Sequence, residues 1–210
     1  LWSGTSIAFS SAAEKIGSLQ LNINRMIFAS LFLISTIFIM GYGFDLSRSQ
    51  FTNLIISGII GLVIGDSFLF KSYQMIGARI SMLLMALSPA MSAILAFIFL
   101  NETISLLGII GILVTLSGIA LVVLERNVNS KYQITTLGVV YGILGAIGQA
   151  GGLIFAKFAF NEGHITGFIA TFIRVFSSVI IFLPIMMILK KYRNPYKLFS
   201  TNKSALGITL

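Results

Sequence analysis

Long apolar segments with almost no charged residues divide this chain from end to end. An α-helix needs about 20 apolar residues to cross the hydrocarbon core of a bilayer. Strands of a membrane barrel are about half as long and alternate between apolar and polar side chains. The sequence therefore predicts an all-α multi-pass membrane protein. The expected spans are 1–13, 26–44, 50–70, 80–101, 103–124, 132–156 and 167–189, with an eighth beginning near residue 205.

The two ends of the sequence lie within apolar segments. The first residue is Leu1 rather than Met, and the last is Leu210. No basic segment or cleavage site typical of a signal peptide precedes the first span. We therefore expect a fragment of a longer protein, truncated after about seven and a half helices.

The composition excludes several classes of protein. Only 10% of the residues are charged, against roughly 25% in soluble domains. The net charge of +8 is carried between the apolar segments rather than along one face, so it indicates a lipid bilayer rather than nucleic acid as partner. With no cysteine and one histidine, His164, the chain lacks the ligands of a thiolate or histidine metal site. We expect no cofactor.

A shift of 149 residues places Arg25 on Arg174, each near the start of an expected span. Five spans lie within one such period. Because five is odd, the second unit must enter the membrane from the opposite side. The sequence thus predicts inverted five-helix repeats over residues 1–127 and 132–210, an architecture found in many secondary transporters. The further matches are Glu14 with Glu162 (one residue of slippage), Thr52 and Asn53 with Thr201 and Asn202, and Gly58 and Ile59 with Gly207 and Ile208.

Basic residues are shared unequally between the two sets of connections. Eleven flank the connections after the first, third, fifth and seventh spans, and three flank the others. Cytoplasmic loops carry an excess of Lys and Arg, so the first set is predicted to be cytoplasmic. The eleven are Lys15, Arg25, Lys71, Arg79, Arg126, Lys131, Lys190, Lys191, Arg193, Lys197 and Lys203, and the three are Arg48, Lys157 and Arg174.

Several short motifs resemble the EamA-type transporters of the drug/metabolite transporter superfamily. The most specific is a mid-helix proline followed by an acidic residue before the next helix, here Pro89 and Glu102. The resemblance covers essentially the whole chain. The motifs are Gly65-Asp66, Ile76-Gly77-Ala78-Arg79, Leu87-Ser88-Pro89, Asn101-Glu102-Thr103-Ile104, the run from Gly118 to Arg126, and Ile147-Gly148-Gln149-Ala150-Gly151-Gly152.

This resemblance implies ten helices in two inverted repeats around a central cavity. It implies a protein of the cell membrane that exports or exchanges small metabolites such as amino acids. The family's usual orientation places the N-terminus inside, which is the reverse of the orientation that the basic residues predict.

Asp66 is the only acidic residue well inside an expected span. A carboxylate at membrane depth usually faces a cavity or a basic partner. It could bind a cationic group or carry a coupling proton. Alternatively, it could pair with Lys71 or Arg79 and only hold the hairpin between the third and fourth spans. Tyr73 lies seven residues later and falls on nearly the same side of the helix.

The two arginines that match across the repeat are also open to two interpretations. Arg25 and Arg174 could contact an anionic group or act in gating. Each could instead extend along the helix so that its guanidinium reaches the lipid headgroups. Snorkelling suits Arg25, at the edge of its expected span, better than Arg174, about ten residues after His164.

Pro89 and a series of glycines predict local features of the bundle. Pro89 removes a backbone donor and kinks its helix; the kink could line a substrate path, or Ser88 or Ser92 could fill it. Glycines three or four residues apart let membrane helices approach closely. Gln149 is the polar exception on its span and a candidate for the cavity wall. The glycines are Gly61 and Gly65 on one span and Gly138, Gly142, Gly145, Gly148, Gly151 and Gly152 on another.

The leading function is therefore a secondary transporter that moves a small-molecule substrate by alternating access. The alternatives are a membrane-embedded enzyme and a receptor. An enzyme would need paired acids, or a serine with a histidine, at membrane depth, and His164 lies in a loop. A retinal-type receptor would need a lysine deep in the last helix, and 167–189 contains none.

Overall fold

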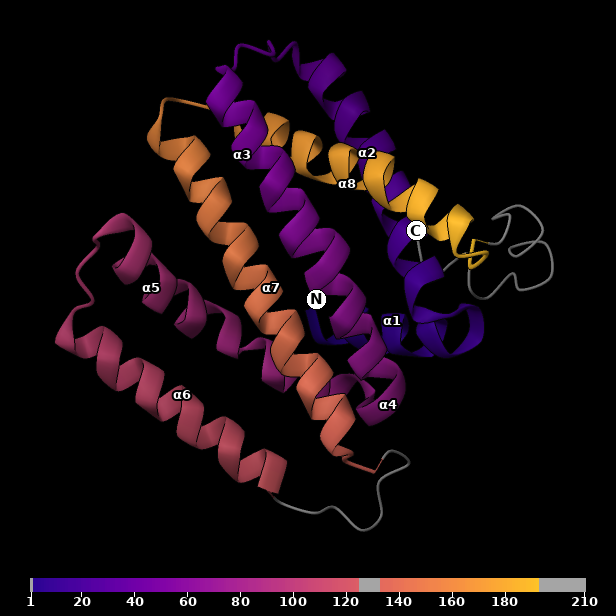
Figure 1. Ribbon diagram of the computed structural model, residues 1–210, viewed down its shortest axis with the longest axis vertical. Coiled ribbons are helices and arrows are strands. Elements are labelled where there is room, and N and C mark those ends of the chain that lie inside the picture. The colour runs from indigo at the N-terminus through magenta and orange to yellow at the C-terminus, as the bar shows by residue number, and fades with distance from the viewer. Residues whose placement is uncertain (1, 125–132, 193–210) are drawn as a thin grey trace.

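A computed structural model describes residues 2–124 and 133–192, and within these ranges all the regular structure is helical (Figure 1). The fold class predicted from the sequence is thereby confirmed as that of an all-α multi-pass membrane protein. The expected eighth span and the repeat matches at 201–208 lie outside the described residues. The elements are α1 (Trp2–Ile16), α2 (Ser18–Met40), α3 (Arg48–Gly58), the π-helix η1 (Ile59–Gly65), α4 (Asp66–Met85), α5 (Leu87–Leu100), α6 (Leu106–Leu124), α7 (Thr136–Asn161) and α8 (Gly167–Ile188).

The second span begins earlier than the charge pattern predicts. Gly17, at φ 93°, ends α1, and α2 starts at the next residue. A positive φ costs glycine little because it has no Cβ, so a single residue makes the turn. Arg25 therefore lies about two turns inside α2, rather than at its edge. The polar run that precedes it is helical and buried: Ser18, Gln20, Asn22 and Asn24.

The third and fourth spans are joined without the loop expected at 71–79. The helix runs from α3 through η1 into α4 and turns sharply at Gly77, where φ is 76°. The hydroxyl of Ser81 donates to the carbonyl of Gly77 at 2.8 Å, and it also lies 2.8 Å from the hydroxyl of Ser72. The fourth span thus consists of the end of α4 followed by α5, with a break at Ala86.

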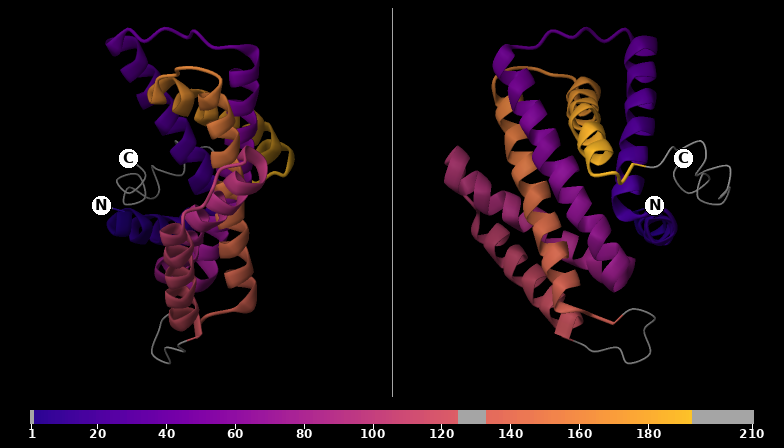
Figure 2. Two further views of the ribbon diagram at one scale, coloured as in Figure 1. Left: turned by 90° about the vertical axis from the view of Figure 1, so that its left-hand side faces the viewer. Right: turned by 45° about the vertical axis from the view of Figure 1, so that its right-hand side comes forward.

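The long helices form a bundle with α7 against α3, η1 and α4, while α2 packs along α8 (Figures 1 and 2). Figure 2 shows α2 and α8 running in opposite directions and α1 lying across the bundle. At one end, the carboxylate of Glu162 accepts hydrogen bonds from Ser47 at 3.0 Å and Asn53 at 3.4 Å. At the other end, Gln74 donates to the carbonyl of Ala13 at 2.6 Å. The connection between α2 and α3 therefore lies beside that between α7 and α8, at the end of the bundle opposite the turn between α1 and α2.

Glycines make the contact between α7 and η1. A Cβ added to Gly148 would lie 2.6 Å from the Cα of Gly65, and one added to Gly152 would lie 2.8 Å from the Cα of Gly61. The hydroxyl of Ser57 also donates to the carbonyl of Gly152. The close packing predicted from the glycine spacing is confirmed, because backbone meets backbone with no room for a side chain.

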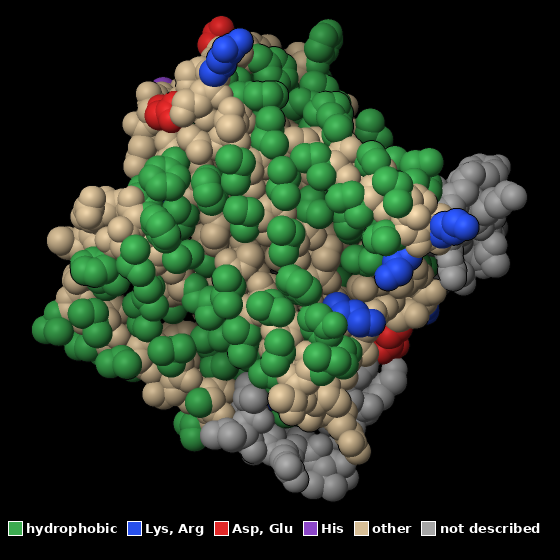
Figure 3. Space-filling view, in the orientation of Figure 1, with side chains coloured by type: hydrophobic (Ala, Val, Ile, Leu, Met, Phe, Trp, Pro, Cys, Tyr) green, Lys and Arg blue, Asp and Glu red, His purple; other side chains and the backbone are tan. Residues whose placement is uncertain are grey.

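The outer surface of the bundle is apolar. Phe38 is 88% exposed and Leu107 is 82% exposed, values that suit lipid rather than water. Figure 3 shows hydrophobic side chains over most of one face. Among the described residues, four helices are long and apolar enough to cross a membrane, and α5 and α6 contain shorter apolar helices.

Filling one of the buried glycine positions is expected to destabilise the bundle. Gly148→Ala should lower the free energy of unfolding by roughly 1–3 kcal/mol, because the new methyl group overlaps the backbone of η1. Gly118→Ala on α6 is the matched control, because a Cβ there meets nothing within 4 Å. Unfolding midpoints in detergent would measure both. Equal midpoints for the two variants would contradict the close contact.

The charge distribution predicts the orientation of the bundle. The end with Lys71 and Arg79 should be cytoplasmic. The chain has no cysteine, so Arg79→Cys and Asp45→Cys provide single labels at opposite ends, both at exposed positions. A membrane-impermeant maleimide applied to intact cells should label Asp45→Cys at once and Arg79→Cys only after permeabilisation. The reverse result would establish the orientation usual in EamA-type transporters.

Candidate functional site

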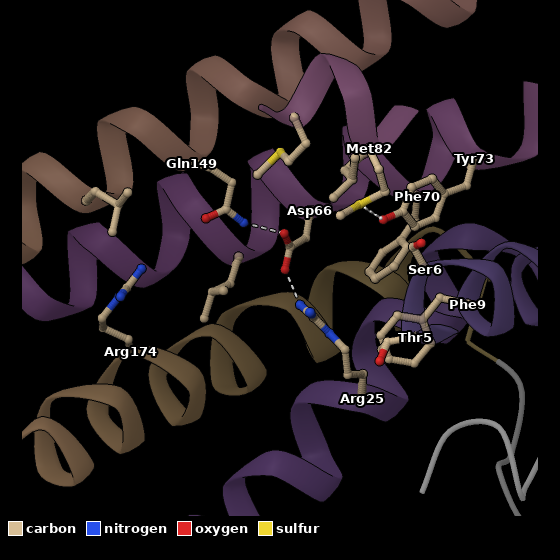
Figure 4. Close-up of a pocket in the computed structure, with 14 residues that line it drawn as sticks. Thr5, Ser6, Phe9, Arg25, Asp66, Phe70, Tyr73, Met82, Gln149 and Arg174 are labelled. Carbon is tan, nitrogen blue, oxygen red and sulfur yellow. Dashed lines mark hydrogen bonds and ion pairs between the residues drawn. The ribbon is translucent and has the colours of Figure 1, made fainter. Parts of the chain in front are cut away.

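A cavity of about 320 Å³ lies inside the bundle, among α1, α2, η1, α4, α7 and α8 (Figure 4). Its wall contains all five residues that the sequence analysis proposed for the substrate path: Arg25, Asp66, Tyr73, Gln149 and Arg174. These side chains come from four different helices and are up to 149 residues apart in the sequence. The volume falls within the range usual for small-molecule sites.

Asp66 is the centre of the polar part of this wall. Its side chain is 4% exposed and forms an ion pair with Arg25 of α2. Its second carboxylate oxygen accepts a hydrogen bond from the side-chain amide of Gln149 on α7. A buried carboxylate is tolerated only when it is paired and hydrogen-bonded, and here two separate helices supply those partners.

The guanidinium of Arg25 is held on its other sides by a ring and an amide. Its central carbon lies 5.2 Å from the centre of the Phe70 ring, which is within the range of a cation–π contact. It also donates to the side-chain oxygen of Asn22 at 3.4 Å. Asn22 in turn donates to the carbonyl of Leu62 at 3.0 Å and to Ser67 at 3.3 Å. Arg25 is thus directed into the cavity and not toward the headgroups.

The π-helix sets the direction of the Asp66 side chain, so that it faces Arg25 and Gln149. The backbone N–H of Asp66 bonds to the carbonyl of Gly61, five residues earlier. Such i→i−5 bonds widen the turn and change which side the following residues face. The same segment carries Gly61 and Gly65, which allow α7 to approach and bring Gln149 within reach of the carboxylate.

Arg174 reaches the cavity from α8 and has no charged partner among the described residues. Its Nε is buried and has no hydrogen-bond partner there. One terminal nitrogen lies 3.5 Å from the point where Gly61 would carry a Cβ, and the side-chain oxygen of Gln149 lies 3.7 Å from that point. Figure 4 shows Gln149 between Asp66 and Arg174, with its oxygen on the Arg174 side.

The opposite part of the cavity is apolar. Phe70 packs edge-on against Phe9, with ring centres 5.8 Å apart, and against Tyr73 at 5.5 Å. The hydroxyl of Tyr73 lies 2.8 Å from the sulfur of Met82. Met85 and Leu69 complete this side. The cavity therefore has one charged side and one side of mainly aromatic rings and thioethers, with Thr5 and Ser6 beside Phe9 and Phe70 (Figure 4).

Other proposed residues lie outside the cavity. Pro89 is in the first turn of α5 and is exposed, and Ser88 beside it is buried. A proline is tolerated in a first turn because the N–H that it lacks would have no helical partner. The hydroxyl of Ser92, one proposed filler of the kink, has no partner among the described residues. Lys71 lies 3.5 Å from Gln74, so the hairpin pairing proposed for Asp66 is replaced by the pair with Arg25.

Sequence reasoning missed Asn22 and the aromatic side of the cavity. Asn22 is fully buried, but the polar run 18–24 was assigned to a loop. Its spacing of three residues from Arg25 could have indicated the contact, because residues at i and i+3 are neighbours on a helix. Phe9, Phe70 and Met82 carried no signal, since apolar residues are common everywhere in this chain.

The arrangement suits binding rather than covalent chemistry. Among the described residues, no group of three or more His, Cys, Asp or Glu side chains lies close enough to hold a metal ion. The described cavity wall contains one carboxylate, two guanidiniums, an amide, a phenol and the two hydroxyls of Thr5 and Ser6. These groups can orient a polar ligand and hold or move a proton.

The fold and the cavity define a multi-pass membrane protein with a cavity among its helices whose wall carries charged side chains. The model of the EamA-like transporter family matches residues 1–124, more than half of the chain. The chain belongs to this family, whose members are transporters rather than enzymes. No curated protein matches the sequence.

Breaking the pair between Arg25 and Asp66 from one side should cost stability. Asp66→Asn and Arg25→Gln should each lower the free energy of unfolding by roughly 2 kcal/mol, less than a fully buried pair would lose, because Arg25 is 30% exposed. The double variant should lose less than the sum of the two, since it leaves no unpaired charge. Strictly additive losses would show that the two groups do not interact.

Proposed function

We propose that this protein is a secondary transporter of the cell membrane that moves a small organic metabolite by alternating access. The substrate would occupy the cavity around Asp66. The observation that carries the proposal is that this cavity brings together two arginines, a carboxylate and an amide from helices on both sides of the proposed repeat boundary. A polar site at such an interface is the usual location of a substrate in transporters built from inverted repeats.

The inverted repeat itself is supported by the helix positions. The first residue of α8, Gly167, lies 149 residues after the first residue of α2, Ser18, which is the shift found in the sequence. The two helices run in opposite directions (Figure 2), as inversion requires. Arg25 and Arg174, which match under this shift, both line the one cavity.

Asp66 is proposed to act in the transport cycle rather than only to hold two helices together through an ion pair. A carboxylate held by one arginine and one amide can change partners when the two halves move. When the pair with Arg25 opens, Asp66 is free to accept a coupling proton or to contact a cationic group. A role limited to packing would leave transport unaffected once the protein is folded.

Transport by the full chain in proteoliposomes tests this proposal, with a panel of metabolites and flux expressed per folded molecule. Asp66→Asn should lose most of the flux. The double variant Arg25→Gln/Asp66→Asn should recover stability but not flux, because the carboxylate is still absent. Glu162→Gln, which removes a carboxylate at the end of the bundle, is the control and should retain flux.

Two results would contradict the proposal at different levels. Normal specific flux in well-folded Asp66→Asn would remove Asp66 from the mechanism and leave Arg174 and Gln149 as candidates. The absence of uptake, efflux and exchange for every metabolite by the folded wild-type chain would contradict the transporter function itself.

A further inference from the structure

The described wall of the cavity contains two guanidiniums and one carboxylate, so it carries one excess positive charge. Arg25 is paired with Asp66, whereas Arg174 has no ion pair among the described residues. Asp66 is the one carboxylate in the wall, and Arg25 and Gln149 already occupy its two oxygens. Arg174 is half-buried, and a charge that is partly removed from water and has no ion pair favours a ligand that brings one negative charge.

The residues beside Arg174, Gln149 and Gly61, favour the binding of such a ligand to its guanidinium. The amide nitrogen of Gln149 is committed to Asp66, so its oxygen, the negative end of the amide, is on the Arg174 side (Figure 4). Gly61 adds no side chain beside the terminal nitrogen of Arg174. The terminal nitrogens of the guanidinium are therefore the donors that face a ligand, because Nε is buried and has no surface that a ligand could reach. A planar guanidinium with free N–H groups matches the two oxygens of a carboxylate.

The opposite side of the cavity indicates what the carboxylate is attached to. Phe9, Phe70, Met82 and Met85 form an apolar surface in the same cavity, which suits a ring or a short aliphatic group. A cation would add to the uncompensated charge, and a zwitterion would leave the net charge of the site unchanged. A monoanion neutralises it.

We infer that Arg174 binds the carboxylate of a small monoanionic substrate whose apolar body lies against Phe9, Phe70 and Met82. The inference rests on the proposed function in treating the ligand as a transported substrate. The binding site is nevertheless testable without transport. In this conformation Arg25 forms an ion pair with Asp66, whereas Arg174 binds the ligand. The two arginines that match in the repeat therefore have different roles.

Four probes of nearly equal size and different charge test the inference by equilibrium binding to the full chain in detergent. They are phenylacetate, phenylacetamide, phenethylamine and phenylalanine: an anion, a neutral amide, a cation and a zwitterion. Phenylacetate should bind the wild type most tightly. Arg174→Gln should weaken phenylacetate binding at least tenfold and leave phenylacetamide binding unchanged. Arg79→Gln removes a positive charge outside the cavity and should change neither.

Arg174→Lys provides a second variant if the glutamine variant does not fold. It keeps the charge but not the planar pair of donors, so phenylacetate should bind it several-fold more weakly than the wild type. Tighter binding of phenethylamine or phenylalanine, unchanged affinity in both Arg174 variants, or no phenylacetate binding by the folded wild type would overturn the inference. Phenylacetate binding that depends on Arg174 without flux of any metabolite would instead contradict the transporter function alone. Flux of cations that is unaffected by Arg174→Gln would contradict the anion site alone.

Discussion

The contact between the backbones of α7 and η1 is the constraint on which the interior of this protein depends. In a bilayer, apolar side chains gain little by leaving lipid for protein, so close van der Waals packing holds helices together. Gly148 against Gly65 and Gly152 against Gly61 bring the two helices as near as their main chains allow. At that separation the amide of Gln149 reaches Asp66. A larger residue at any of these positions would move the cavity wall apart.

The same contact makes the polar interior tolerable. A carboxylate at membrane depth has no water to solvate it and must be satisfied by protein groups. Asp66 receives an arginine from α2 and an amide from α7, and the arginine is further held by Asn22 and the ring of Phe70. The network joins α2, α4 and α7, which are far apart in the sequence. A rearrangement of α2 relative to α7 would therefore change the partners of Asp66, which is the property that alternating access requires of a site between two moving halves.

The candidate residues were predictable from the sequence, whereas their partners were not. A charged residue within an apolar span is rare and therefore conspicuous, so Asp66, Arg25 and Arg174 could be selected without a structure. Lys71 and Arg79 were reasonable partners for Asp66 because they are near it in the chain, but Lys71 is exposed beside Gln74 and Arg79 lies beyond the turn at Gly77. Arg25 was placed at a helix edge because charge was taken to mark the end of the span. Pro89 was expected to kink the middle of a helix, but it lies in the first turn of α5 because the break falls at Ala86.

The sequence by itself determined that the chain is helical, where most of the spans lie and which polar side chains are at membrane depth. The reason is local: each membrane helix must satisfy its own backbone hydrogen bonds, so a run of apolar residues suffices to define it. The tertiary structure alone decided that α2 begins at Ser18, that η1 is a π-helix, and that Asp66 pairs with Arg25 while Arg174 is left without a charged partner among the described residues. The start of α2 follows from the turn at Gly17, whereas the pairing of Asp66 depends on contacts between helices far apart in the sequence, and such contacts follow from packing geometry that no local pattern records.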